Sequence, residues 1–126
     1  MPLDKADYEW MEFLVGYAED WDRTFRTTRT TYFTQDYWYL FTACIIGEQQ
    51  KTPLSMTDAA SKMRVSLSPG AKKERIDLAV TDGWLVEERS TTDARSKLLL
   101  PTDKLRTAMK AHLERTRQEA LKRLAR

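Results

Sequence analysis

The chain has 126 residues, about one domain's worth, and 41% of them are hydrophobic, which is enough for a packed interior. The formal net charge of +2 is weak evidence for a polyanionic partner. No apolar run approaches the ~20 residues that a membrane span needs, and the acidic, aromatic start does not resemble a secretory signal. The single cysteine excludes an intramolecular disulfide and suits a reducing cytoplasm.

Charge is unevenly distributed along the chain. Residues 1–50 carry four basic and nine acidic side chains, residues 51–101 carry nine and seven, and residues 102–126 carry eight and three. An acidic head and a basic tail can pair with each other within a dimer. Two solvated helix faces of different sign would explain the same numbers.

Two helices are predicted in the first 50 residues. From about Asp4 to Phe25, apolar residues recur at helical spacing, with Asp20 and Asp22 on the outer face. The stripe consists of Trp10, Leu14, Ala18, Trp21 and Phe25. After a Thr- and Arg-rich connection, residues 35–50 predict a central core helix that is apolar on nearly every side.

The ends of the second helix are also marked in the sequence. Thr34 is suited to cap it, Asp36 suits its positive end, and Gly47 or the polar run after it is suited to end it. Cys44 lies in the apolar run, where a free cysteine usually acts as a small hydrophobe rather than as a redox sensor.

Residues 54–101 carry the most informative pattern. Ser55 with Asp58 resembles a capping box for a short helix, and Ser68 with Pro69 starts a second helix that Gly83 ends. A strand at 84–89, a polar turn and a strand at 96–101 follow. This is the layout of a winged helix-turn-helix, which offers one helix to the DNA major groove and a hairpin to the flanking backbone or minor groove.

The tail from Asp103 to Arg126 predicts a terminal helix with a narrow apolar stripe, which needs a partner helix. The stripe consists of Leu105, Met109, Leu113, Thr116, Ala120 and Leu124. We therefore expect a mainly α fold with a small β-hairpin wing (α+β), in a single domain over residues 1–126. Residues 1–50 and 102–126 would supply dimerisation helices, and residues 54–101 the DNA-binding lobe.

Three stretches of this region resemble the multiple-antibiotic-resistance regulator (MarR) family of winged-helix transcription factors. They are LSMTDAASKM, RIDLAVTDGWLVEER and TTDARSKLLLPTDKL, the last with Asp93 and Arg95 in the family's Asp-any-Arg pattern. The resemblance implies a homodimer with interlocked terminal helices, bound to a near-palindromic operator. It also implies release of DNA when a small aromatic acid binds between the dimerisation helices and the lobe.

Cationic and small residues of the lobe are the candidates for DNA contact. The start of the recognition helix supplies long cations and exposed amides for phosphates, and Arg95 at the hairpin tip suits a narrow minor groove. The full set is Arg64, Ser68, Gly70, Lys72, Lys73, Arg75, Arg89, Arg95 and Lys97. The alternative for the recognition-helix lysines is ordinary solvated surface.

Aromatic residues suggest where an effector would bind. A flat-ring pocket would be lined by Trp10, Phe13, Tyr17, Trp38 and Phe41, although aromatics at helical spacing also build plain cores. Arg23, Arg26 or Arg29 would meet an acid group at its mouth, and the sequence does not choose among them.

Enzyme functions have little support. One His and one Cys give no metal site of the usual spacing, and four scattered glycines form no phosphate loop. His112 lies close to the apolar stripe of the terminal helix, which indicates a structural or solvent-exposed role.

We therefore expect a cytoplasmic, ligand-responsive homodimeric repressor of transcription that binds double-stranded DNA without a cofactor. The alternatives are a winged-helix protein-interaction adaptor without DNA binding and a ligand-independent DNA-binding accessory protein.

Overall fold

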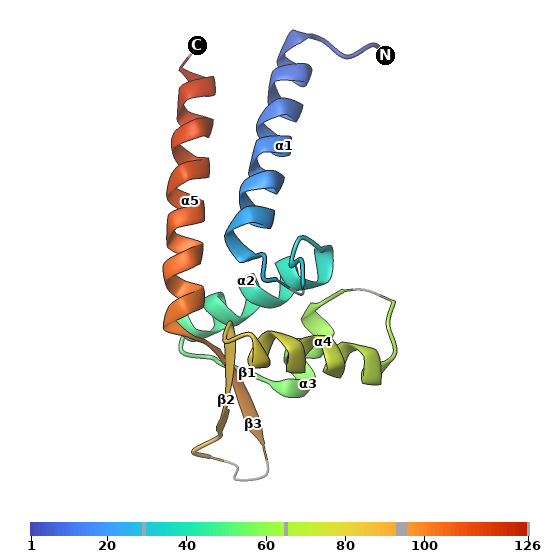
Figure 1. Cartoon of the computed structure of the whole chain (residues 1–126), viewed down its shortest axis with the longest axis vertical. Helices are drawn as coiled ribbons and strands as arrows, with labels where there is room; N and C mark the ends of the chain where they lie inside the picture. Colours follow the sequence, from blue (N-terminus) through green and yellow to red (C-terminus); the bar gives the residue numbers. More distant parts are fainter. Residues whose placement is uncertain (29, 65, 93–95, 126) are drawn as a thin grey trace. The chain divides into compact units, whose positions relative to one another are not determined.

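The computed structural model describes residues 1–28, 30–64, 66–92 and 96–125. These residues form five helices and a three-stranded antiparallel sheet, which confirms the expected mainly helical chain with a small sheet (Figure 1). The chain divides into two compact units. The first comprises residues 1–33 and 108–126, and the second comprises residues 34–107. In the described part of the chain, no helix is both long and apolar enough to cross a membrane.

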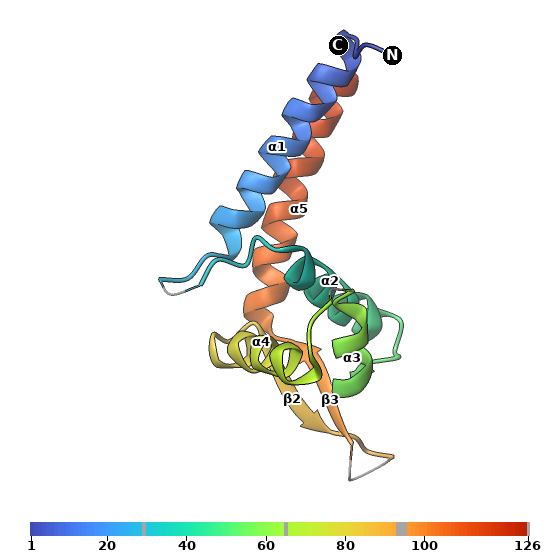
Figure 2. The same cartoon turned by 90° about the vertical axis from the view of Figure 1, so that its right-hand side faces the viewer.

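The first unit pairs α1 (Lys5–Phe25) with the later turns of α5 (Asp103–Leu124), side by side (Figures 1 and 2). Asp4 caps α1 through a capping box, in which its carboxylate accepts from the amide of Asp7 at 3.0 Å and the carboxylate of Asp7 accepts in return at 2.9 Å. Arg123, late in α5, donates to the carbonyl of Glu9, early in α1, at 2.9 Å. The two helices are therefore antiparallel.

The buried face of α1 differs from the predicted stripe. Trp21 and Phe25 are buried as expected, but Trp10 and Leu14 are exposed. The prediction that Asp20 lies on the outer face is wrong, because its side chain is buried against α5. A carboxylate is stable there because α5 supplies hydrogen-bond donors opposite it.

The second unit is the winged helix-turn-helix. It contains α2 (Gln35–Gln49), β1 (Leu54–Ser55), α3 (Met56–Lys62), α4 (Pro69–Thr81), β2 (Leu85–Arg89) and β3 (Lys97–Pro101). The sheet order is β1-β3-β2, so the hairpin predicted for the wing has a third strand beside it. In the register, Leu54 lies opposite Leu99, and Val86 lies opposite Leu100. The core of this unit consists of Tyr37, Leu40, Phe41, Cys44, Ala59, Met63, Ile76, Ala79, Trp84, Leu85, Leu99 and Leu105.

Helix α2 is the central core element of this unit, as predicted, because it packs against α3, β1 and β3. It belongs to the compact unit of residues 34–107. Cys44 is buried in α2, and burial raises the pKa of its thiol to about 12. A thiol held protonated in this way packs as an apolar group.

Helices α2 and α4 end in the same hydrogen-bond pattern, the Schellman motif. After α4, the amides of Gly83 and Trp84 donate to the carbonyls of Val80 and Ala79 at 3.0 and 2.9 Å, and Gly83 has a φ of 84°. After α2, the amides of Lys51 and Thr52 donate to the carbonyls of Glu48 and Gly47 at 3.1 and 2.9 Å, and Lys51 has a φ of 61°. The left-handed position is thus taken by glycine once and by lysine once.

Candidate nucleic-acid interface

The start of α4 is open to solvent and carries an exposed helix N-terminus. Ser68 caps it, since its hydroxyl accepts from the amide of Ala71 at 3.1 Å, and Pro69 occupies the first helical position as predicted. Gly70 is exposed, and nothing lies within 4 Å of the place where a Cβ would stand. Pro69 has no N–H and the amide of Ala71 is bound by the Ser68 cap, so the positive end of the helix dipole is what favours an anion such as a phosphate at this first turn.

The two lysines of α4 differ in their neighbours. Lys73 forms an ion pair with Asp77, one turn later, at 2.7 Å, and this contact raises the pKa of the Lys73 ammonium. Lys72 is half-buried and has no ion-pair partner among the described residues. Lys72 is therefore the α4 lysine whose charge is available to a partner.

Arg75 is held against α2 by an ion pair rather than left free. Its guanidinium forms an ion pair with Asp36 in the first turn of α2, where the Asp36 side chain is only 2% exposed. The hydroxyl of Tyr37 donates to the backbone carbonyl of Arg75 at 2.9 Å. Burial acts to raise the pKa of Asp36, but hydrogen bonds and the charge of Arg75 keep it below its usual value. Arg75 thus fixes α4 against α2.

The remaining cations lie in the α3–α4 turn and on the wing. Arg64 has a φ of 53°, and its guanidinium lies over the ring of Tyr39 at 5.5 Å from the ring centre. Arg89 and Lys97 lie opposite each other on β2 and β3, and Lys97 approaches Glu87 at 3.5 Å. Arg95, with Asp93, lies outside the described residues.

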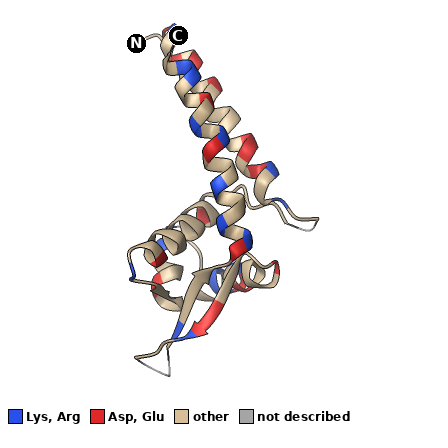
Figure 3. Ribbon diagram, turned by 90° about the vertical axis from the view of Figure 1, so that its left-hand side faces the viewer, with Lys and Arg blue, Asp and Glu red and all other residues tan. Residues whose placement is uncertain are grey.

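The structure brings only part of the predicted set together. Lys72, Lys73 and Lys97 line one cavity beside α4, whereas Arg64 lines a different hollow next to α2. Both signs of charge occur on α4 and on the wing strands (Figure 3). The candidate interface therefore consists of separate cations mixed with carboxylates and not of a continuous basic surface.

The five aromatic residues predicted for an effector pocket belong to different units. Trp10, Phe13 and Tyr17 lie on α1, where the rings of Trp10 and Phe13 are 4.8 Å apart. Trp38 and Phe41 lie on α2, with Trp38 partly exposed and Phe41 buried against Tyr37 and Trp84. The effector pocket therefore stays a prediction.

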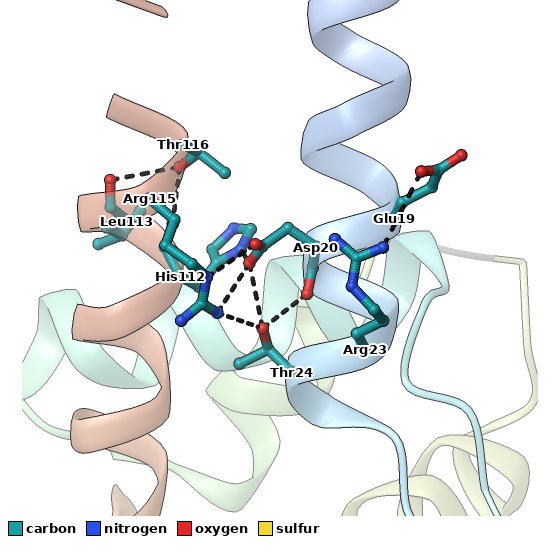
Figure 4. A network of polar contacts seen from close by, with 8 residues as sticks. All are labelled: Glu19, Asp20, Arg23, Thr24, His112, Leu113, Arg115 and Thr116. Atoms are coloured by element: carbon teal, nitrogen blue, oxygen red, sulfur yellow. Dashed lines mark hydrogen bonds and ion pairs between the residues drawn. The ribbon is translucent and has the colours of Figure 1, made fainter. Parts of the chain in front are cut away.

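A polar network that the sequence did not reveal joins α1 to α5 (Figure 4). The carboxylate of Asp20 accepts from His112 Nδ1 at 2.8 Å and from Arg115 Nε and Nη2 at 2.8 and 3.0 Å. The hydrogen bond from Arg115 holds the pKa of Asp20 well below its usual value, against the effect of burial. The same contact raises the pKa of Arg115.

His112 has a structural role in this network. Its side chain is fully buried, and its ring lies 4.8 Å from that of Tyr17 and 5.4 Å from that of Trp21. Because Asp20 is ionised, Nδ1 is the donor, and Nε2 has no hydrogen-bond partner among the described residues. The described residues contain no cluster of three His, Cys, Asp or Glu side chains that could hold a metal ion.

Comparison with known proteins finds a similar architecture among solved structures only. No protein-family model matches the chain, and no curated protein matches it in sequence. Among solved structures, RV1404 from Mycobacterium tuberculosis superposes with a TM-score of 0.67 at 14% identity, covering 98% of this chain and 82% of that one. AbsC, a MarR family transcriptional regulator from Streptomyces coelicolor, gives a TM-score of 0.52 at 14% identity, with 94% and 80% covered.

The chain has the MarR fold. A third structure with this fold is the transcriptional repressor CouR bound to a 23-mer DNA duplex, with a TM-score of 0.56 at 16% identity and coverage of 93% and 75%. In the MarR fold as this chain adopts it, the start of α4 and the β2–β3 hairpin belong to one compact unit.

Proposed function

We propose that this protein is a sequence-specific, double-stranded-DNA-binding regulator of transcription, in the form of a homodimeric, ligand-responsive repressor in the cytoplasm, and not an enzyme. The observation that carries the proposal is the solvent-open start of α4 in one unit with a wing. It carries the Ser68 cap and Lys72, which has no ion-pair partner in the part of the chain that the structure describes. The likeness in fold to CouR, whose structure holds a DNA duplex, supports it.

The proposed contacts use lysines and arginines of the lobe whose side chains reach solvent. Lys72, Lys73 and the amides around Gly70 would meet phosphates at the start of α4. Arg89, Lys97 and Arg64 would meet the flanking backbone, and Arg95 the minor groove. We assign Arg75 to positioning α4, because its guanidinium is committed to the buried Asp36.

Homodimerisation is proposed from an apolar surface on the first unit. Leu14 on α1 is 49% exposed, and Met11, Val15 and Trp10 are exposed near it. On α5, Leu113 and Leu121 are also exposed. Large apolar side chains that gather on one surface mark an interaction site. A second copy would cover them and place two lobes on the two halves of a near-palindromic site.

The test is a titration of the full chain against random-sequence duplex DNA at several salt concentrations. A DNA-binding regulator should lose affinity as salt rises, because phosphate contacts release counterions. Lys72→Gln should reduce the slope of log K against log salt by about one unit. Lys110→Gln, an exposed α5 lysine, should leave the slope unchanged.

Two outcomes would contradict the proposal. Binding that does not depend on salt, or no binding, would favour the protein-interaction adaptor. Unchanged affinity in Arg95→Ala would remove the wing from the interface. Selection of bound duplexes from a random pool should return two related half-sites whose spacing reports the geometry of the dimer.

A further inference from the structure

A hollow with a volume of about 440 Å³ lies between α2, β1 and the end of α3, within the unit of residues 34–107. We call it the α2 groove, and its lining includes Trp38, Ala43, Ile46, Leu54, Lys62 and Arg64. None of its lining residues lies on α4 or on the wing strands. The α2 groove is therefore a different surface from the start of α4.

Small residues on α2 leave room for the groove. Ala43 is partly exposed and lines it without filling it. Gly47 approaches the next segment so closely that a Cβ there would lie 3.0 Å from the carbonyl oxygen of Thr52. Leu54, on β1, lines the groove as well. The groove is thus a consequence of the small residues on this side of α2.

Two large apolar side chains of α2 reach solvent at the groove. Trp38 is 39% exposed and Ile46 is 53% exposed, whereas Leu40 and Phe41 of the same helix are fully buried. A helix that is apolar on all sides is normally covered on all sides. Trp38 and Ile46 stand about two turns apart, roughly 12 Å along the helix axis. A ligand that covers both must therefore be elongated, as a segment of protein is.

The charged residues that line the groove are both cations. Lys62 and Arg64 are exposed, and no Asp or Glu lies among the described lining residues. Neither cation forms an ion pair with another described residue. The guanidinium of Arg64 lies over the ring of Tyr39, which keeps its charge at the groove. The complement of such a surface is an apolar strip with carboxylates beside it.

We propose that the α2 groove binds an acidic amphipathic helix of a partner protein. The apolar face of that helix covers Trp38, Ala43 and Ile46, and its carboxylates meet Lys62 and Arg64. An amphipathic helix laid in an apolar groove is a recurring mode of peptide recognition. Burial of the apolar residues supplies the affinity, and the charges at the edge fix the orientation of the helix.

This inference goes beyond the proposed function and does not rest on it. Of the lining residues, only Arg64 also belongs to the proposed DNA contacts. A regulator built in this way would hold a second protein at α2 while the start of α4 meets DNA.

The test uses a synthetic helical peptide of about 14 residues, long enough to cover the roughly 12 Å between Trp38 and Ile46. It carries leucine along one face and glutamate elsewhere, and a second peptide carries lysine in place of every glutamate. The full chain labelled with ¹⁵N is titrated with each peptide. The acidic peptide should give saturable shifts at the amides of Ala43, Ile46 and Lys62, and the basic peptide should give none there.

Two variants of the groove have matched controls. Ile46→Gln should weaken binding of the acidic peptide roughly tenfold because it removes apolar area, and Lys62→Glu roughly tenfold because it reverses a charge. Val86→Gln removes an exposed apolar side chain from β2, and Lys110→Glu reverses an exposed lysine on α5. Both controls should bind as the unmodified chain does. Thermal unfolding verifies that all four variants are folded.

No saturable binding, equal binding of the acidic and basic peptides, or unchanged affinity in either groove variant would overturn the proposal. Light scattering tests whether a second copy of the chain fills the groove instead. A lower particle mass for Ile46→Gln than for the unmodified chain would make the groove an interface between copies and overturn the partner helix. The titration contains no DNA, so failure of the proposed function leaves the groove standing, and failure of the groove leaves the proposed function standing.

Discussion

Asp20 shows how one buried residue can tie the two ends of the chain together. Its carboxylate accepts hydrogen bonds from His112 and Arg115, which lie 92 and 95 residues later in the sequence. The ionised form is favoured in the folded chain, since the Arg115 contact holds the pKa of Asp20 below its usual 3.8. A carboxyl whose pKa is lower in the folded chain than in the unfolded chain stabilises the fold at pH values above its unfolded pKa.

The first prediction concerns acid stability. Asp20→Asn should destabilise the chain by about 2 kcal/mol at neutral pH, since charge-assisted hydrogen bonds are lost while the half-exposed Arg115 is partly screened by water. The stabilising contribution of Asp20 is complete above pH values near 3.8 and is lost as the pH falls below that value. Urea unfolding measured between pH 7 and pH 2.5 should show that the two proteins, the unmodified chain and Asp20→Asn, become more similar in their free energy of unfolding as the pH falls.

Glu114→Gln serves as the matched control on α5, because Glu114 is exposed and has no ion pair among the described residues. It should follow the unmodified chain at every pH. A gap that persists unchanged at pH 2.5 would show that the ionisation of Asp20 does not stabilise the fold.

At the scale of secondary-structure elements, the two Schellman motifs differ only in the residue at their left-handed position. Gly83 adopts a φ of 84° without a side-chain clash, whereas Lys51 adopts 61° at a cost of about 1 kcal/mol for a residue with a Cβ. Lys51 is exposed, so it gains nothing from burial in return.

The second prediction follows from this difference. Lys51→Gly should stabilise the chain by up to about 1 kcal/mol, offset in part by the added freedom of glycine in the unfolded chain. Gly83→Ala should destabilise it by about 1 kcal/mol, because a residue with a Cβ is then forced into the left-handed conformation that glycine adopts without strain. Thermal unfolding measures both, and Lys51→Ala, which keeps the strain, should change little. Equal stability of the Gly and Ala variants at position 51 would contradict the argument.

The sequence predicts those elements whose boundary signals are local. Ser68 with Pro69, Ser55 and Gly83 mark helix ends through contacts within a few residues, and the structure confirms all of them. β1 was missed because two residues beside Pro53 carry no periodicity, and its partner Leu99 belongs to a distant strand.

The candidate site also has a part that the sequence predicts and a part that it does not. The open start of α4 and its lysines could be located from the sequence, because a helix cap and nearby cations are visible in it. The pairing of Arg75 with Asp36, 39 residues away, could not, since either residue alone fits an exposed helix end. Nor could the cavity, which depends on how α3, α4 and the wing pack together.

At the scale of the whole molecule, self-association should depend on the apolar surface of α1. Leu14→Lys places a charge among exposed apolar neighbours such as Met11 and Val15, so a second copy could cover them only by burying that charge. Light scattering at micromolar concentration should report two chains per particle for the unmodified protein. It should report a shift toward the 14.7 kDa monomer for the variant.

Glu19→Lys introduces the same side chain at an exposed position of α1 outside this group and should leave the particle mass unchanged. A 14.7 kDa particle for the unmodified chain would remove the dimer from the proposed function.

The order of the strands has a consequence for solubility. In the described sheet, β2 pairs with β3 alone, so its other side is an open edge where a strand from another molecule could add and begin a fibrous aggregate. Three of its residues, Glu87, Glu88 and Arg89, are charged. Charge along an open edge discourages this edge-to-edge addition of strands, so the wing can stay exposed to solvent without becoming a template for aggregation.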